Sequence, residues 1–226
     1  PLVIDGTLVH AAGLQSGAVR PSHRGRGLYR DVMQAALDHC DGEGFEAVAL
    51  LTDTPDLYRR YGFRPLLQHR FSGEAPDGGN PSPIRRLDIR NDGDVALLSR
   101  LLDGRATVSG RFAPLRQREM FLFNAALAPD VNLDLLEDRD TVIAWQPGAH
   151  GSVELLDVVG PQIPDLADIL ASLAISPARV RVHVAPDRLA WDGVAAPDEG
   201  DMTLMLRSAH TLAPKAPFAL SPMAEF

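Results

Sequence analysis

The sequence predicts an α/β protein with mixed sheets, organised in two halves. Stretches with the alternation or the continuous apolar run of a β-strand recur in order with stretches of helical periodicity. In addition, residues 73–83 are dominated by glycine and proline and show no periodicity, which is typical of a linker. We therefore predict a first half over residues 1–72, a linker over 73–83 and a second half over 84–226.

The first half is predicted to run strand, turn, helix, strand. Strand-like residues run from Gly13 to Val19, within a strand pattern over about residues 7–18, and lead into a basic turn. A helix pattern follows the turn, and Ala47–Thr52 then has the short apolar run of a buried strand. The apolar positions of the helix pattern predict one buried face, formed by Leu28, Val32, Ala35, Ala36 and His39/Cys40.

The turn between strand and helix has the ingredients of an anion site. A helix N-terminus presents unpaired backbone N–H groups and the positive end of the helix dipole. Gly25 and Gly27 allow a ligand to approach that backbone, and Arg24 and Arg26 add positive charge. The turn lacks the three glycines of a dinucleotide fingerprint and the Lys-Ser/Thr of a P-loop. It indicates a pyrophosphate cradle, and the plain alternative is a tight turn with solvated arginines.

A second motif follows the buried strand and makes the first more specific. Residues 58–63 read Tyr58-Arg-Arg-Tyr-Gly62-Phe63. Together the two motifs resemble the GNAT (Gcn5-related) superfamily of acetyl-CoA-dependent N-acyltransferases, which carries an R/Q-x-x-G-x-G/A turn and then Tyr-x-x-x-Gly-Phe. Tyr29 stands where that turn ends in Gly or Ala. This departure, with the residues before the turn, resembles the branch typified by the enhanced intracellular survival (Eis-like) acetyltransferases.

The resemblance implies an acetyl-CoA cosubstrate, no metal, and a primary amine acceptor on a small molecule or a lysine. It implies that Tyr58 protonates the leaving thiolate, as a phenol with an ordinary pKa of about 10 can do. Packing with a satisfied hydroxyl is the alternative for Tyr58, and Tyr61 is expected to pack. Cosubstrate contacts are implied at the backbone of Gly17, Ala18, Val19, Arg24, Gly25, Arg26, Gly27 and Leu28.

No residue of the sequence stands out as the general base. The strand before the turn carries Gln15 and Ser16 and no carboxylate. The Eis-like branch places a C-terminal carboxylate in its active site, which here belongs to Phe226. The last nine residues are apolar enough to dock. A water chain is the other candidate.

The second half repeats the family's element order, which predicts tandem GNAT-like folds. Its counterpart of the basic turn, Val159–Asp165, has no arginine and two prolines, and prolines lack the N–H groups that a phosphate needs. We therefore expect a degenerate fold that binds no coenzyme A. The predicted elements are strand 84–90, a helix capped by Asn91 or Asp92, helix 115–127, strands 131–136, 141–146 and 152–159, a helix from Pro164, and strands 179–185 and 202–206.

The family's fold opens with about 60–70 residues before the strand that leads to the turn. Only residues 1–12 precede that strand here. We therefore expect the first fold to be incomplete at its N-terminus.

Composition excludes several classes of protein. The net charge of −8 and the pI of about 5.3 disfavour nucleic acid as a partner and favour a cationic acceptor. No apolar run approaches the ~20 residues of a membrane span, and no secretory signal is visible, so we expect a cytoplasmic protein without membrane contacts. The single Cys40 excludes an internal disulfide and is expected to be a small buried hydrophobe. The scattered histidines do not form a zinc pattern.

Two other functions stay open beside N-acetyl transfer. One is a catalytically inactive module that binds acyl-CoA or regulates a partner. The other is a structural scaffold with no ligand. Assembly into a homo-oligomer is compatible with either and with an enzyme.

Overall fold

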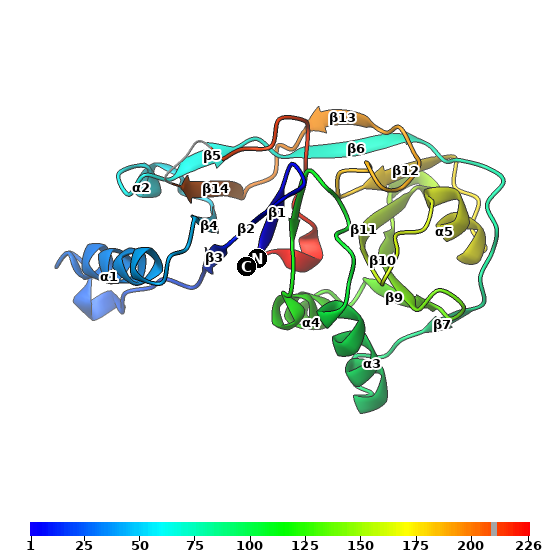
Figure 1. Cartoon of the computed structure of the whole chain (residues 1–226), viewed down its shortest axis with the longest axis horizontal. Coiled ribbons are helices and arrows are strands. Elements are labelled where there is room, and N and C mark those ends of the chain that lie inside the picture. Colours follow the sequence, from blue (N-terminus) through cyan, green and yellow to red (C-terminus); the bar gives the residue numbers. More distant parts are fainter. Residues whose placement is uncertain (209–211) are drawn as a thin grey trace.

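The computed structural model describes residues 1–208 and 212–226, and it confirms an α/β protein with mixed sheets. Figure 1 shows a four-stranded sheet with its helices at one end of the molecule and a seven-stranded sheet at the other. A small three-stranded sheet lies between them. It is made of β1 (Leu2–Ile4), β2 (Thr7–Val9) and β8 (Phe112–Pro114), in the order β2-β1-β8.

The four-stranded sheet contains the strand–helix–strand unit of the first half. Its strands β3 and β4 are parallel, and α1 is the crossover helix between them. The short helix α2 follows β4 and leads into β5. The bounds are β3 Ala11–Leu14, α1 Leu28–Gly42, β4 Ala47–Thr52, α2 Asp56–Arg59, β5 Arg64–Leu66 and β14 Thr203–Ser208, and the strand order is β3-β4-β14-β5.

The strand predicted over Gly13 to Val19 ends earlier, at Leu14. Ser16 has a φ of 57°, in the left-handed region that interrupts a strand for a residue other than glycine. The parallel pairing of β3 with β4 therefore stops at Leu14 and Leu50, while β4 continues to Thr52. The two strands part at this point, and the chain leaves the sheet toward α1.

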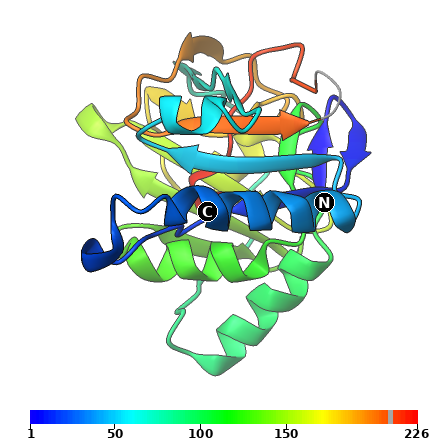
Figure 2. The same cartoon turned by 90° about the vertical axis from the view of Figure 1, so that its left-hand side faces the viewer.

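The buried face of α1 differs from the prediction. Met33, Leu37 and Cys40 face the sheet, whereas Val32 is 55% exposed. Ala35 and His39 are exposed as well. Apolar residues occur at helical spacing on both faces, so periodicity alone could not choose between them. Figure 2 shows α1 in front of the four-stranded sheet, which it covers through contacts with Val48, Leu50 and Met205. The burial of Cys40 is confirmed.

The opposite face of this sheet is covered by chain segments from both ends of the sequence. Ala47, Ala49 and Leu204 on that face pack against the β1–β2 hairpin, against Phe112 of β8, and against residues near the C-terminus. The docking segment includes a 3-10 helix, η3 (Pro222–Ala224). The expected docking of the apolar C-terminal segment is therefore found, because Phe218, Leu220, Met223 and Ala224 are buried.

The seven-stranded sheet contains a second parallel strand–helix–strand unit. Its strands β11 and β12 are parallel and joined by α5. One face of this sheet packs on α5, and the other packs on α3 and α4. Asn91 caps α3 through its side chain, as predicted. The bounds are β6 His69–Glu74, β7 Ile84–Arg86, α3 Asp92–Asp103, α4 Arg118–Leu127, β9 Asn132–Leu136, β10 Thr141–Pro147, β11 Val153–Val159, α5 Leu166–Ser172, β12 Arg179–Val182 and β13 Val194–Pro197.

Strand pairing does not follow the division predicted at residues 72 and 73. Strand β6 spans that point and pairs with β12 and β13 in the seven-stranded sheet. In return β14, near the end of the chain, lies between β4 and β5. The halves thus exchange one strand each, so neither predicted range contains a whole sheet. The glycine- and proline-rich composition of residues 73–83 identifies the loop after β6, but composition does not show which sheet a strand joins.

None of the helices described is both long enough and apolar enough to span a bilayer. Short 3-10 turns occur at η1 (Pro21–His23) and η2 (Ala149–Gly151).

Candidate functional site

A pocket lies where β3 and β4 part. It encloses about 130 Å³, and the end of β3, the first turns of α1, β4 and α2 all contribute to it. Gly17 is at its edge, and a Cβ on Gly17 would lie 3.1 Å from the Tyr29 hydroxyl oxygen, so the backbone passes close to that ring. The lining residues are Leu14, Gln15, Ser16, Gly17, Tyr29, Val32, Met33, Ala36, Leu50, Leu51 and Tyr58.

The basic turn begins beside this pocket and ends at the N-terminus of α1. Gly25 and Gly27 have φ values of 76° and 77°, which a residue with a Cβ rarely adopts. Among the described residues, none accepts a hydrogen bond from the backbone N–H of residues 25–28. Arg24 and Arg26 are exposed at the same turn. The turn can therefore bind an anion through several backbone donors and two charges.

The chain between pocket and turn is also rich in unpaired donors. Gly17, Ala18 and Val19 lie outside any strand, and the described part of the chain offers their N–H groups no acceptor. The side chain of Arg24 donates to the Val19 carbonyl at 3.3 Å, which fixes the turn relative to this segment. A long ligand can thus meet N–H groups from the pocket to the helix N-terminus.

Two phenols meet inside the pocket. The Tyr29 and Tyr58 hydroxyl oxygens are 2.7 Å apart, a short hydrogen bond, and the rings meet edge to face. Burial raises the pKa of Tyr29 well above its usual range, and the hydrogen bond with Tyr58 raises it further. Tyr29 therefore keeps its proton at any physiological pH.

The Tyr-x-x-x-Gly-Phe motif has a structural explanation. Tyr58 is the third residue of α2, and Gly62 has a φ of 88°, which lets the chain reverse direction after this short helix. The reversal buries Phe63 against the Tyr58 ring, with 6.2 Å between the ring centroids. Tyr61 also packs here, and its buried hydroxyl has no hydrogen-bond partner among the described residues.

A second pocket lies on the opposite face of the sheet. Side chains alternate along a strand, so Gly13 and Ala49 face away from Leu14 and Leu50. The pocket encloses about 190 Å³ and is mostly apolar. The buried Oε1 of Gln117, a residue that lines it, has no partner within the described chain. The lining residues are Pro1, Leu2, Ala11, Ala12, Gly13, Ala49, Phe112, Pro114, Leu115, Arg116, Gln117 and Phe226.

Phe226 lies directly against β3 in this second pocket. A Cβ on Gly13 would approach the Phe226 ring to 3.2 Å, which is a tight contact, so the ring packs closely on the β3 backbone. The backbone just before Phe226 is held by α4, because the Asn124 side chain donates to the Glu225 carbonyl at 2.8 Å.

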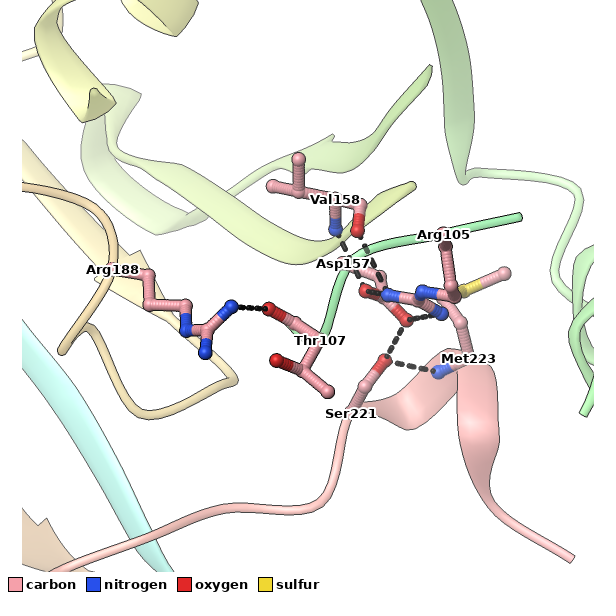
Figure 3. Close-up of polar contacts among 7 residues, drawn as sticks. All are labelled: Arg105, Thr107, Asp157, Val158, Arg188, Ser221 and Met223. Carbon is pink, nitrogen blue, oxygen red and sulfur yellow. Dashed lines mark hydrogen bonds and ion pairs between the residues drawn. The ribbon is translucent and has the colours of Figure 1, made fainter. Parts of the chain in front are cut away.

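A buried polar network holds the C-terminal segment on β11 (Figure 3). Asp157 is fully buried and forms an ion pair with Arg105, which also donates to the Val158 carbonyl at 2.8 Å. The Ser221 hydroxyl donates to Asp157 at 2.8 Å and accepts from the Met223 N–H at 3.1 Å. The network therefore joins the loop after α3, strand β11 and the segment that carries Phe226.

The structure thus divides the predicted site residues between two places. Gly17 and Tyr58 line the first pocket, and Arg24 to Leu28 form the glycine turn beside it. Phe226 lies across the sheet in the second pocket. Sequence reasoning missed two residues. Tyr29 was visible only as a departure from a motif, and no pattern pointed to Gln117, which approaches β3 from a distant loop.

The comparisons with known proteins agree with this geometry. Residues 1–66 match the family model of the acetyltransferase (GNAT) domain. The first 66 residues therefore belong to the GNAT superfamily. The chain is 31% identical over 87 residues to YhbS of Escherichia coli strain K12, named an uncharacterized N-acetyltransferase. It is also 30% identical over 105 residues to an uncharacterized N-acetyltransferase of Streptomyces griseus.

These alignments are partial. They cover 38% of this chain and 52% of YhbS, and 40% of this chain and 25% of the Streptomyces protein. The chain therefore spans about half of the length of YhbS and about a quarter of the length of the Streptomyces protein.

Solved structures extend the likeness to both halves. Eis1 from Mycobacterium abscessus has a TM-score of 0.61 at 19% identity, over 91% of this chain and 58% of Eis1. A GCN5-related N-acetyltransferase from Kribbella flavida has a TM-score of 0.54 at 19% identity, over 92% of this chain and 54% of that protein. At 19% identity the similarity shows the fold alone. Because the aligned regions cover more than 90% of this chain, the similarity extends to the second strand–helix–strand unit.

Proposed function

We propose that this GNAT protein is an acetyl-CoA-dependent N-acetyltransferase that acts on a primary amine. One observation carries the proposal. The gap between the parallel strands β3 and β4 is lined by Tyr58 and lies next to a glycine turn with unpaired N–H groups at the start of α1. A thioester with a diphosphate on its long arm needs these features in this order.

The residues present suit coenzyme A along its length. The pyrophosphate would be held by the N–H groups of Gly25 to Leu28, with Arg24 and Arg26 adding charge. The pantetheine amides and the thioester carbonyl would accept hydrogen bonds from Gly17, Ala18 and Val19. No metal is needed for this binding. Among the described residues, no group of three or more His, Cys, Asp and Glu is arranged to hold one.

The chemistry then follows from the two pockets. The amine nitrogen attacks the thioester carbonyl carbon, and the carbon–sulfur bond breaks as the tetrahedral intermediate collapses. The departing sulfur takes the proton of the Tyr58 hydroxyl, which is later restored from solvent. The nitrogen loses its proton to a base on the acceptor side. We propose the α-carboxylate of Phe226 for this role, because Phe226 lies against β3 in the second pocket.

The second pocket supports an acceptor with an apolar body and one amine. Its walls are mostly alanine, leucine, proline and phenylalanine side chains, and the unpartnered Oε1 of Gln117 can accept a hydrogen bond from an ammonium or amine. The net charge of −8 favours a cationic acceptor by long-range attraction. A small-molecule amine and a lysine side chain both satisfy these requirements.

We further propose that the second fold binds no coenzyme A. Its helix α5 is only seven residues long and is preceded by a turn with two prolines. The pocket at this turn is lined by Asp138, Asp140, Asp165 and Asp168, with Arg139 as its basic residue. Arg139 is already paired with Asp168 at 2.8 Å. A diphosphate would meet an excess of negative charge there.

One experiment separates the proposal from its alternatives. The full chain is incubated with acetyl-CoA and a panel of small aliphatic amines, aromatic amines and a lysine peptide. Thiol release is followed beside a thermal shift measurement. The proposal predicts stabilisation by acetyl-CoA and amine-dependent thiol release. Stabilisation without release would favour an inactive acyl-CoA-binding module, and neither effect would favour a scaffold.

A further inference from the structure

Tyr29 stands in the first turn of α1, where the family motif ends in Gly or Ala. Its ring fills the space beside Gly17, and its hydroxyl oxygen lies 2.7 Å from that of Tyr58. Both tyrosines line the pocket between β3 and β4. Tyr29 is therefore the one described side chain that hydrogen-bonds the Tyr58 hydroxyl.

The direction of this hydrogen bond follows from counting protons. Each phenol carries one. If Tyr58 is to give its proton to the departing sulfur, that proton cannot also be donated to Tyr29. Tyr29 must then donate to the Tyr58 oxygen. Burial raises the pKa of Tyr29, so Tyr29 keeps the proton it needs for this role while Tyr58 loses its own.

We propose that Tyr29 is a positioning residue that aims the Tyr58 proton at the sulfur and stabilises the Tyr58 phenolate. The inference rests on the proposed acetyl transfer. The Tyr58 O–H bond breaks, an S–H bond forms, and the negative charge that leaves the sulfur appears on the Tyr58 oxygen. The Tyr29 O–H···O hydrogen bond strengthens as that charge develops, and no proton leaves Tyr29.

The size of the effect follows from the kind of hydrogen bond. Donors to a charged partner contribute more than donors to a neutral one, and the charge is present only after the proton has moved. Losing the donor should therefore lower kcat about 10- to 100-fold. The KM for acetyl-CoA should change less than about twofold, because binding precedes the charge.

A purely space-filling role for Tyr29 predicts something else. Tyr29→Phe keeps the ring beside Gly17 and removes only the hydroxyl, so packing is preserved. If Tyr29 only fills space, kcat and its pH dependence should stay as in wild type. Tyr61→Phe is the matched control, because it removes a nearby hydroxyl that has no hydrogen-bond partner in the described chain.

The experiment is steady-state thiol release by the full chain, with an amine that wild type acetylates, for Tyr29→Phe, Tyr58→Phe, Tyr61→Phe and the double variant of residues 29 and 58. We expect the loss stated above for Tyr29→Phe and wild-type rates for Tyr61→Phe. The alkaline limb of the kcat profile should move to higher pH in Tyr29→Phe, because a phenolate without its donor forms less readily. In the Tyr58→Phe background the second substitution should add less than about twofold.

Two outcomes would overturn the inference while the proposed function stands. They are wild-type kcat in Tyr29→Phe, and losses that multiply independently in the double variant. A wild-type chain that binds acetyl-CoA but acetylates no amine would contradict the proposed function itself, and with it the role of Tyr29. Acetyl-CoA affinity and thermal unfolding of each variant show whether the fold is retained.

Discussion

Removing the Ser221 hydroxyl should weaken the attachment of the C-terminal segment. Ser221→Ala deletes a hydrogen bond to the buried Asp157 carboxylate and one from the Met223 N–H. A hydrogen bond to a charged group contributes about 1.5–3 kcal/mol, and a capping bond contributes about 1 kcal/mol. We therefore expect a loss of about 3 kcal/mol in the free energy of unfolding. For a chain of this length that lowers Tm by roughly 6–12 °C.

The assay is thermal unfolding of wild type, Ser221→Ala and a control. Ser152→Ala is a suitable control, because its hydroxyl donates to the Ala149 carbonyl in an exposed turn, so the expected loss is below about 0.5 kcal/mol. The Ser221→Ala chain should also show a higher KM for the amine at unchanged acetyl-CoA affinity, since the loosened segment carries Phe226. A Tm within 1 °C of wild type would show that the network does not hold this segment.

The remaining predictions concern the cosubstrate and the acid. Tyr58→Phe should lower turnover, measured by thiol release, by about 10²-fold or more with little change in acetyl-CoA affinity. Wild-type activity in this variant would mean that water, and not Tyr58, protonates the leaving thiolate. Arg26→Glu should weaken acetyl-CoA binding about tenfold and Gly27→Pro should abolish it, whereas the distant, exposed Arg90→Glu should have no effect in calorimetry. Unchanged acetyl-CoA affinity in Gly27→Pro would show that the pyrophosphate binds elsewhere. Calorimetry on the full chain should give one acetyl-CoA per chain, and a second site would contradict the degenerate second fold.

The full chain is needed for that last measurement because of the strand exchange. Residues 84–226 alone would lack β6, which pairs with both β12 and β13. They would also carry β14 without its partners β4 and β5. Such a fragment would expose strand edges on both sheets, so its failure to bind could reflect misfolding.

The local features of the first half were predictable because their signals are local. The apolar run of β4 gave its bounds without error, and the glycine turn marked the start of α1. Gly27 and Gly62 both have positive φ values, which explains why the two motifs carry glycine at these positions, and Gly25 has a positive φ as well. Sequence spacing therefore located both the glycine turn at the start of α1 and the position of Tyr58 in α2.

The features that the sequence did not predict depend on backbone conformation and tertiary packing, which the spacing of residues along the chain does not reveal. The early end of β3 depends on the left-handed backbone conformation of Ser16. Serine also occurs within strands, so the residue type did not reveal this conformation. The buried face of α1 was ambiguous because both faces carry apolar residues. The position of Phe226 depends on the Arg105–Asp157–Ser221 network, which joins residues more than 50 positions apart. Strand exchange and the Tyr29–Tyr58 contact are likewise set by tertiary packing.

The most direct test of the account is a crystal structure of the full chain with coenzyme A. The account predicts the pyrophosphate on the N–H groups of Gly25 to Leu28, the pantetheine beside Gly17 to Val19, and the sulfur within hydrogen-bonding distance of the Tyr58 hydroxyl. Coenzyme A bound at α5, or bound at α1 with its sulfur away from Tyr58, would contradict it.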